Sequence, residues 1–109
     1  MSSTEKDKFI AMIGFAKRAG KIVFGIDKLK AARGVKLLAV SDTASDNLSE
    51  EMRRLAQKRD LPLVVAAALE DTVGNNVKAL GITDPNMASA MWDHATHAPQ
   101  YKTEYGLRR

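Results

Sequence analysis

The sequence predicts an α/β fold, a three-layer α/β/α sandwich built around a small mixed sheet of about four strands. Short apolar runs such as "VKLLAVS" and "LVVAA" are typical of buried strands, and they alternate with segments whose apolar residues recur at helical spacing. This alternation favours helices packed on both faces of one sheet. The 109 residues suit one domain, which we expect over residues 1–98, with residues 99–109 as a flexible C-terminal tail.

The first third of the chain predicts a helix, a short strand and a second helix. Thr4, with Asp7 three residues later, forms a candidate capping box, and apolar residues at helical spacing follow it. The first helix is therefore expected over residues 4–19. Residues 21–24 are a short strand candidate, and the second helix opens directly after them and is stopped by Gly34.

The middle of the chain predicts two buried strands with a helix between them. The first strand is "VKLLAVS". Asn47, with Glu50 three residues later, resembles a capping box and precedes apolar residues at helical spacing, so a third helix is expected over about 48–59. Pro62 ends this helix, and "LVVAA" is the second strand.

The last third predicts a short helix, a strand and a longer helix. Residues 69–73 form the short helix, which Gly74 ends, and "VKALGIT" is a further strand. Asp84 followed by Pro85 caps a last helix that runs to about Ala98. The remaining "QYKTEYGLRR" has no periodicity, and for this reason we expect it to be flexible.

The charge of the chain favours an acidic partner. Lys and Arg total 17 against 13 Asp and Glu, and the sequence pI is near 9.5. Seven of the basic residues fall within a segment whose only acid is Asp27: Lys17, Arg18, Lys21, Lys28, Lys30, Arg33 and Lys36. The chain has no cysteine, and its polar start "MSSTEKDKF" contains no apolar run. We therefore expect a cytoplasmic protein that does not enter a membrane.

Signatures of an enzyme are nearly absent from the sequence. His94 and His97 lie one helical turn apart, but no acidic or cysteine third ligand has a fixed place beside them, so no metal site is predicted. The glycines match neither phosphate-loop pattern. Ser41, Ser45 and Ser49 have no histidine nearby in sequence and suit turns and helix caps. We therefore expect neither catalysis nor a cofactor.

The stretch "RAGKIVFGIDK" is the strongest candidate for a binding site. Gly25 opens the second helix, whose first N–H groups are free to bind a phosphate, and a residue without a side chain lets an RNA backbone approach. A branched side chain at Gly25 should then block RNA while the fold survives, provided that the φ angle there is negative. Lys21, Lys28 and Lys30 would add phosphate contacts. The alternative interpretation is that Gly20 and Gly25 are turn residues and the lysines a solvated face.

The chain resembles a known family in "AKRAGKIVFG", in "LLAVSDTASDN" with the helix after it, in the "LP" before the next strand, and in "VKALGITDPNMASAM". This is the ribosomal-protein family of kink-turn RNA binders, the L-seven-Ae and L-thirty-e group, and the similarity is closest to its bacterial YlxQ-like branch. It covers about residues 9–92. The resemblance implies a non-enzymatic protein that binds structured RNA, with ribosomal RNA as the expected partner.

The resemblance also implies where the RNA lies. In the family the second helix begins against the sheared G·A pairs of the kinked RNA, and a flipped-out nucleotide sits between the loop after the second strand and the loop before the short fourth helix. Carried over by position, the implied RNA-binding residues are Lys21, Gly25, Ile26, Asp27, Lys28, Lys30, Ala67 and Ala68.

Four of these positions depart from the family pattern. Asp27 and Lys28 stand where kink-turn binders commonly have Asn or Lys and then Glu or Gln, and Lys can only donate a hydrogen bond to a guanine edge. Ala67 and Ala68 replace the apolar and basic residues that clamp the flipped base. The alternative function is therefore a protein-interaction module of the same fold that has lost affinity for kink-turn RNA.

The expected third helix carries a second basic cluster, Arg53, Arg54, Lys58 and Arg59. It is either a solvated face paired with Glu50 and Glu51 or a second RNA contact. We expect the main basic surface to gather Lys21, Lys28, Lys30 and Lys36, with Glu70 and Asp71 on the opposite face.

Overall fold

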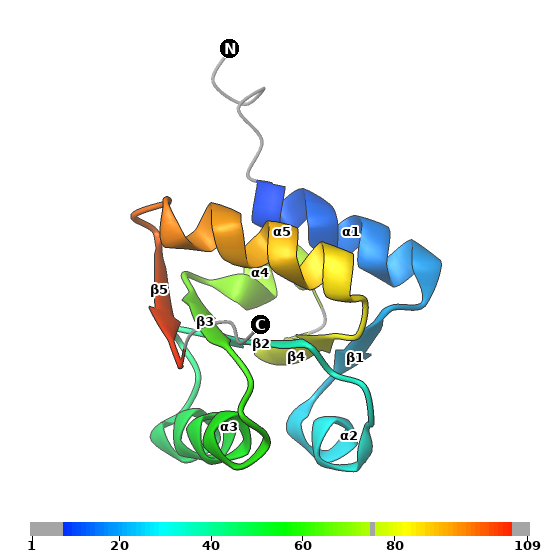
Figure 1. Cartoon of the computed structure of the whole chain (residues 1–109). Helices are drawn as coiled ribbons and strands as arrows, with labels where there is room; N and C mark the ends of the chain where they lie inside the picture. Colours follow the sequence, from blue (N-terminus) through cyan, green and yellow to red (C-terminus); the bar gives the residue numbers. More distant parts are fainter. Residues whose placement is uncertain (1–7, 75, 106–109) are drawn as a thin grey trace.

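A five-stranded mixed sheet forms the middle layer of the protein, and helices cover both of its faces (Figure 1). The computed structural model describes residues 8–74 and 76–105, so the candidate capping box of Thr4 and Asp7 lies outside the described residues. The elements in chain order are α1 (Lys8–Ala19), β1 (Ile22–Phe24), α2 (Ile26–Ala31), β2 (Leu37–Ser41), α3 (Asp46–Arg59), β3 (Leu63–Ala66), α4 (Leu69–Val73), β4 (Ala79–Ile82), α5 (Pro85–Thr96) and β5 (Tyr101–Glu104). The predicted α/β/α sandwich is confirmed.

The strands lie in the order β1-β4-β2-β3-β5. β2 and β3 are parallel, with Leu38 opposite Leu63 and Ser41 opposite Ala66, and all other neighbouring pairs are antiparallel. α3 is the crossover helix that a parallel pair requires. Because β2 and β3 run in the same direction, both finish at the same end of the sheet, where the antiparallel β4 begins.

Two apolar clusters fill the space between the sheet and the helices. Phe9 of α1 and the buried side of α5 pack on one face, and Leu29 of α2 and the buried side of α3 pack on the other. All five residues of β2 are buried. Its side chains alternate between the two clusters, with Leu37 in the first and Leu38 in the second. The continuous apolar pattern of this strand therefore reflects a sheet that is covered on both faces.

Side chains cap two of the helices. Ser45 has extended backbone, and its hydroxyl accepts the N–H of Leu48 at 3.1 Å, so it is the N-cap of α3. The expected capping box of Asn47 and Glu50 is therefore wrong, because Asn47 already lies inside the first turn. The prediction that Asp84 caps α5 is confirmed by two backbone N–H groups that its carboxylate accepts, at 2.8 and 3.0 Å. Within the described residues, no helix has the length and apolarity needed to cross a membrane.

The expectation that residues 99–109 form a flexible tail is wrong for Tyr101–Glu104, which form β5. This strand pairs antiparallel with β3, with Tyr101 opposite Ala66. The Tyr101 ring is buried and lies 4.7 Å from the ring of Phe9, centroid to centroid. The sheet consequently has five strands and not four. The sequence shows no alternation of apolar and polar residues here, because the strand is short and has only one apolar residue. Its pairing with β3 and one aromatic contact hold it in place.

Leu29 of α2 packs directly against the backbone of β4 at Gly81. A Cβ atom built on Gly81 would lie 2.5 Å from Cδ2 of Leu29 and 3.0 Å from Cγ1 of Val35. Leu29 is fully buried, so it can make room for a Cβ only if its neighbours in the core shift. The missing side chain of Gly81 therefore determines how α2 sits on the sheet.

Gly81→Ala should lower the free energy of unfolding by about 1 to 3 kcal/mol, the usual cost of overpacking a core. Gly14→Ala is the matched control, because a Cβ there would meet only the end of the Arg18 side chain, at 3.8 Å. Alanine in place of this helical glycine should be neutral or stabilise by up to about 1 kcal/mol. Urea denaturation measures both variants, and a Gly81→Ala protein as stable as the parent would contradict the close packing of α2.

Candidate nucleic-acid interface

One end of the sheet gathers the segments that the sequence resemblance associates with RNA. β1, β2 and β3 finish there and β4 begins there. The backbone N–H of Gly25 donates to the carbonyl oxygen of Ala79 at 2.9 Å, and that of Ser41 donates to the carbonyl oxygen of Lys78 at 2.8 Å. The start of α2 is therefore fixed beside the segment that leads into β4.

The loops after β2 and β3 are joined at the same end. The N–H of Asp42 donates to the carbonyl oxygen of Ala66 at 2.9 Å, and the Asp42 carboxylate accepts the N–H of Ala68 at 3.0 Å. From β1 to β3 there are three strand spacings, about 14 Å in all. The start of α2 and the turn before α4 thus border one continuous surface. We call it the sheet-end surface and define it by Gly25, Ile26, Asp27, Lys28, Ala67, Ala68 and Lys78.

Gly25 is the N-cap of α2, with φ of 89° and ψ of 148°. Glycine adopts this backbone conformation readily, and residues with a side chain do not. A Cβ atom built on Gly25 would have no neighbour within 4 Å. The condition that φ is negative is therefore not met, and Gly25→Val would strain the backbone as well as obstruct an approaching RNA. The conformation of the chain alone accounts for a glycine here.

The next three residues divide between the core and the surface. Ile26 is half-buried against the apolar cluster under α2, whereas Asp27 and Lys28 are exposed. α2 has only six residues, which is less than two helical turns. Side-chain charge must therefore supply most of the attraction for a phosphate, because such a short helix has a small dipole.

Two of the expected site lysines lie away from the sheet-end surface. Lys21 precedes β1, and its carbonyl oxygen accepts a backbone hydrogen bond from the loop after β4, at the opposite end of the sheet. β1 separates it from Gly25 by roughly 13 Å. Lys30 lies toward α3, where its Nζ donates to Oε2 of Glu51 at 2.8 Å. The structure therefore brings Lys28 to the sheet-end surface, and not Lys21 or Lys30.

Ala67 and Ala68 form the turn between β3 and α4. Ala67 is exposed, and Ala68 is the N-cap of α4 in the left-handed conformation, with φ of 47° and ψ of 46°. A residue with a Cβ rarely adopts this conformation, and the Asp42 carboxylate helps to hold it here. Two methyl groups offer neither a hydrogen bond nor a stacking surface to a nucleotide, so the side chains of this turn can contribute shape only.

A hydrogen-bonded cluster of Ser41, Thr43 and Glu70 lies next to the sheet-end surface. The hydroxyls of Ser41 and Thr43 donate to the two carboxylate oxygens of Glu70, each at 2.5 Å. The Ser41 oxygen also accepts the N–H groups of Thr43 and Leu69, both at 3.2 Å. The hydrogen bonds from Ser41 and then from Thr43 lower the pKa of Glu70 to about 2. The cluster ties the end of β2 to the first turn of α4.

Lys78 is a further candidate site residue, and the sequence did not indicate it. It is half-buried beside Gly25, and its charge contributes to the lowered pKa of Glu70. With Phe24, Ile26 and Val77 it lines a depression of about 370 Å³ next to the start of α2. A single lysine before a buried strand does not by itself indicate a binding site in the sequence. Only the strand order, which places β4 between β1 and β2, reveals its neighbours.

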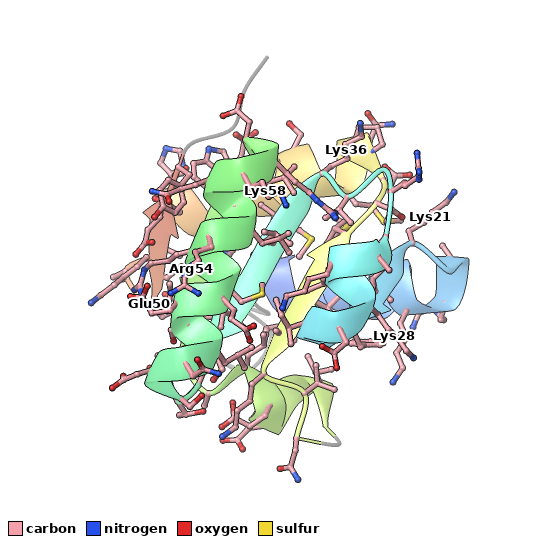
Figure 2. The ribbon with its side chains drawn as sticks, turned by 90° about the horizontal axis from the view of Figure 1, so that it is seen from below. Lys21, Lys28, Lys36, Glu50, Arg54 and Lys58 are labelled. Atoms are coloured by element: carbon pink, nitrogen blue, oxygen red, sulfur yellow. The ribbon has the colours of Figure 1, made fainter. Side chains whose placement is uncertain are left out.

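The basic residues form a broader surface than expected (Figure 2). α2 and α3 lie side by side on this face, with Lys28 and Lys36 toward opposite ends of the face and Arg54 and Lys58 on α3. The expected single cluster of Lys21, Lys28, Lys30 and Lys36 is therefore spread along the edge and face of the α2 layer. α4, which carries Glu70 and Asp71, contributes Leu69 to the cluster on the other face of the sheet.

His94 and His97 contact residues near them in the structure. Nδ1 of His97 lies 2.8 Å from the carbonyl oxygen of Asp93, and the His94 ring meets the Tyr101 ring edge-on at 6.0 Å. Within residues 8–74 and 76–105, no three His, Asp or Glu side chains are arranged to hold a metal ion.

Among known proteins, a similarity is found at the level of the fold. No protein-family model and no curated protein matches the chain. A solved structure of a protein of unknown function from Bacillus halodurans matches with a TM-score of 0.72 and 19% sequence identity, over 82% of this chain and 97% of that chain. At this level of identity the similarity shows that the two proteins share a fold.

Glu70→Gln should destabilise the protein at pH 7, and the loss should vanish in acid. A carboxyl whose pKa falls from 4.5 to about 2 on folding stabilises the folded state above pH 4.5, and this contribution disappears as the pH falls toward 2. Urea denaturation between pH 7 and pH 2 measures the difference between parent and variant. Glu50→Gln, at an exposed position on α3, is the control. An equal pH dependence for both variants would contradict the role of the Ser41 and Thr43 hydroxyls.

Proposed function

We propose that the protein is a non-enzymatic, cytoplasmic RNA-binding protein that recognises structured RNA of the kink-turn type through the sheet-end surface. The observation that carries the proposal is that Gly25–Lys28 and Ala67–Ala68 lie at the same end of the sheet, three strand spacings or about 14 Å apart. These two segments are 39 or more residues apart in the sequence, and the sequence resemblance implies RNA contacts for both.

The chemistry of the surface suits RNA that is recognised by shape. Lys28 and Lys78 supply positive charge for phosphates, and Asp27 supplies an acceptor for a base edge or a 2′-hydroxyl. Ala67 and Ala68 leave room for a bulky group between the loops. No aromatic side chain is among the residues that define this surface, so stacking on single-stranded bases is not the expected mode. A kinked duplex presents phosphates and 2′-hydroxyls on a bent backbone, and these groups suit the charges of the surface better than single-stranded bases do.

A second candidate function is a protein-interaction module that keeps this fold without affinity for kink-turn RNA. The same surface motivates it, because Asp27 and Lys28 depart from the usual base-reading pair and the methyl groups of Ala67 and Ala68 cannot clamp a base. The two functions differ in one measurable property. An RNA reader prefers a kinked RNA to a straight duplex of the same length and charge.

The test is fluorescence anisotropy with a kink-turn RNA and an unkinked duplex of equal length, each at several potassium chloride concentrations. We expect tighter binding to the kinked RNA at every salt concentration. Lys28→Ala should weaken that binding and reduce the slope of log K against log salt by about one, because roughly one counterion is released for each phosphate contact. Lys17→Ala, at an exposed position on α1 across the sheet, removes the same charge and is the control.

Equal and weak binding to both RNAs would overturn the proposal and favour the protein-interaction module. A Lys28→Ala protein that binds like the Lys17→Ala protein would place the RNA elsewhere on the molecule. Circular dichroism of both variants establishes that they are folded.

A further inference from the structure

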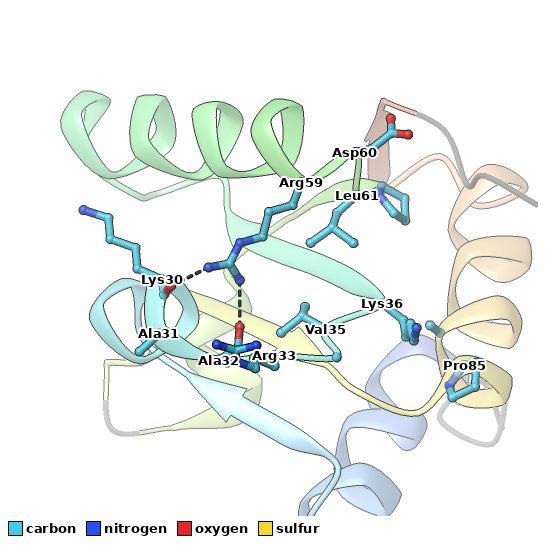
Figure 3. A pocket seen from close by; sticks show the side chains of 13 residues that line it. Lys30, Ala31, Ala32, Arg33, Val35, Lys36, Arg59, Asp60, Leu61 and Pro85 are labelled. Carbon is cyan, nitrogen blue, oxygen red and sulfur yellow. Dashed lines mark hydrogen bonds between the residues drawn. The ribbon is translucent and has the colours of Figure 1, made fainter.

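A basic groove runs between α2 and α3, on the face of the sheet described above. It is a depression of about 320 Å³ between the two helices that continues, at the C-terminal end of α2, into a cavity of about 850 Å³ (Figure 3). Lys30 and Arg59 line both parts. We define the basic groove by its six cationic side chains, Lys30, Arg33, Lys36, Arg54, Lys58 and Arg59.

Arg59 fixes the geometry of the basic groove. Its guanidinium reaches from the last turn of α3 to the end of α2, where Nη1 donates to the carbonyl oxygen of Ala32 at 2.8 Å (Figure 3). Nη1 also donates to the carbonyl oxygen of Leu29, at 3.0 Å. Nη2 donates to the carbonyl oxygen of Lys30. These bonds satisfy carbonyl groups that a helix end leaves open. The two helices are therefore held at a fixed separation, and a ligand does not have to order the groove.

Most of the positive charge in the basic groove is uncompensated. Arg33, Lys36, Arg54 and Lys58 are exposed, and within residues 8–74 and 76–105 none of them forms a salt bridge. The acids that line the groove are Glu51 and Asp60. Glu51 pairs with Lys30, and the pair is exposed enough to rearrange when a phosphate competes for the lysine. Six basic side chains thus face two acidic ones in one groove.

The arrangement of Arg54 and Lys58 matches an extended anion. They are one helical turn apart on α3, which gives a rise of about 6 Å along the helix. Arg33 and Lys36 line the cavity at the C-terminal end of α2, beyond Lys30 and Arg59. Aromatic side chains are not among the groove-lining residues in the described part of the chain. A repeating polyanion such as a nucleic-acid backbone meets these groups better than a base or a single small anion does.

We propose that the basic groove binds the phosphate backbone of an RNA stem and extends the footprint of the sheet-end surface. The inference rests on the proposed function, because it takes structured RNA as the partner. α2 links the two surfaces: its first residues border the sheet-end surface, and its last residues border the groove about 9 Å away. One RNA can therefore contact the sheet-end surface with its kink and the basic groove with an adjoining stem.

The experiment compares two kink-turn RNAs that differ in the length of one stem. The groove variant is Arg54→Ala with Lys58→Ala, two exposed residues outside the Arg59 bonds. The control variant is Lys8→Ala with Lys17→Ala, which removes two exposed charges from α1 on the other face of the sheet. For the long-stem RNA, the groove variant should lower the salt slope by about two and weaken binding several-fold at low salt. For the short-stem RNA, groove and control variants should behave alike.

The outcomes separate this inference from the proposed function. If the parent prefers kinked RNA and the groove variant equals the control on the long-stem RNA, the inference is wrong while the proposed function stands. If the parent binds kinked and straight RNA equally, the proposed function fails. In that case, a salt slope still lowered by about two in the groove variant keeps the groove as an RNA contact. An unchanged slope rejects the groove inference together with the proposed function. Polyglutamate that competes with the long-stem RNA as well as unlabelled RNA does would assign the groove to an acidic protein and overturn the inference.

Discussion

The parallel pairing of β2 with β3 is the constraint on which the rest of the structure depends. Parallel neighbours need a crossover, so α3 must return along one face of the sheet, and this places it beside α2. The same pairing brings Ser41 and Ala66 to one end of the sheet. The loops that follow them must meet there, and the Ser41, Thr43 and Glu70 hydrogen bonds then fasten α4 to that end. The sheet-end surface and the basic groove both follow from this one pair of strands.

α2 is the element that the two surfaces share, and three separate contacts position it. Gly25 turns the chain into it, Gly81 lets Leu29 settle on the sheet, and Arg59 binds its final carbonyl groups. A helix of six residues has little stability of its own. Its place is therefore determined almost entirely by tertiary contacts, which is how a short basic segment can present Lys28 in a fixed position.

Much of the fold could be predicted from the sequence because its strongest patterns are local. β2 and β3 are unbroken apolar runs, and α3 and α5 have regular helical spacing with polar residues at their starts. The rest depends on contacts between distant residues. β5 carries one buried ring, Ser45 rather than Asn47 caps α3, and Gly25 has a positive φ and donates a hydrogen bond to Ala79. The candidate site was predicted at Gly25–Lys28 and Ala67–Ala68 together with Lys21 and Lys30, and these two lysines lie elsewhere, at the opposite end of the sheet and toward α3. Lys78 became visible only once β4 lay between β1 and β2.

β5 gives the sheet an outer border of different chemistry from its interior. Without it, the "LVVA" of β3 would present unpaired backbone groups along an apolar edge, which is a template for pairing with another chain. With it, the border strand reads "YKTE", and Lys102 and Thr103 are exposed there. Charged residues on a border strand discourage further strand addition. β5 thus disfavours self-association through the sheet edge. A chain cut before Tyr101 would expose the edge of β3 and would also lose the buried Tyr101 ring from its core.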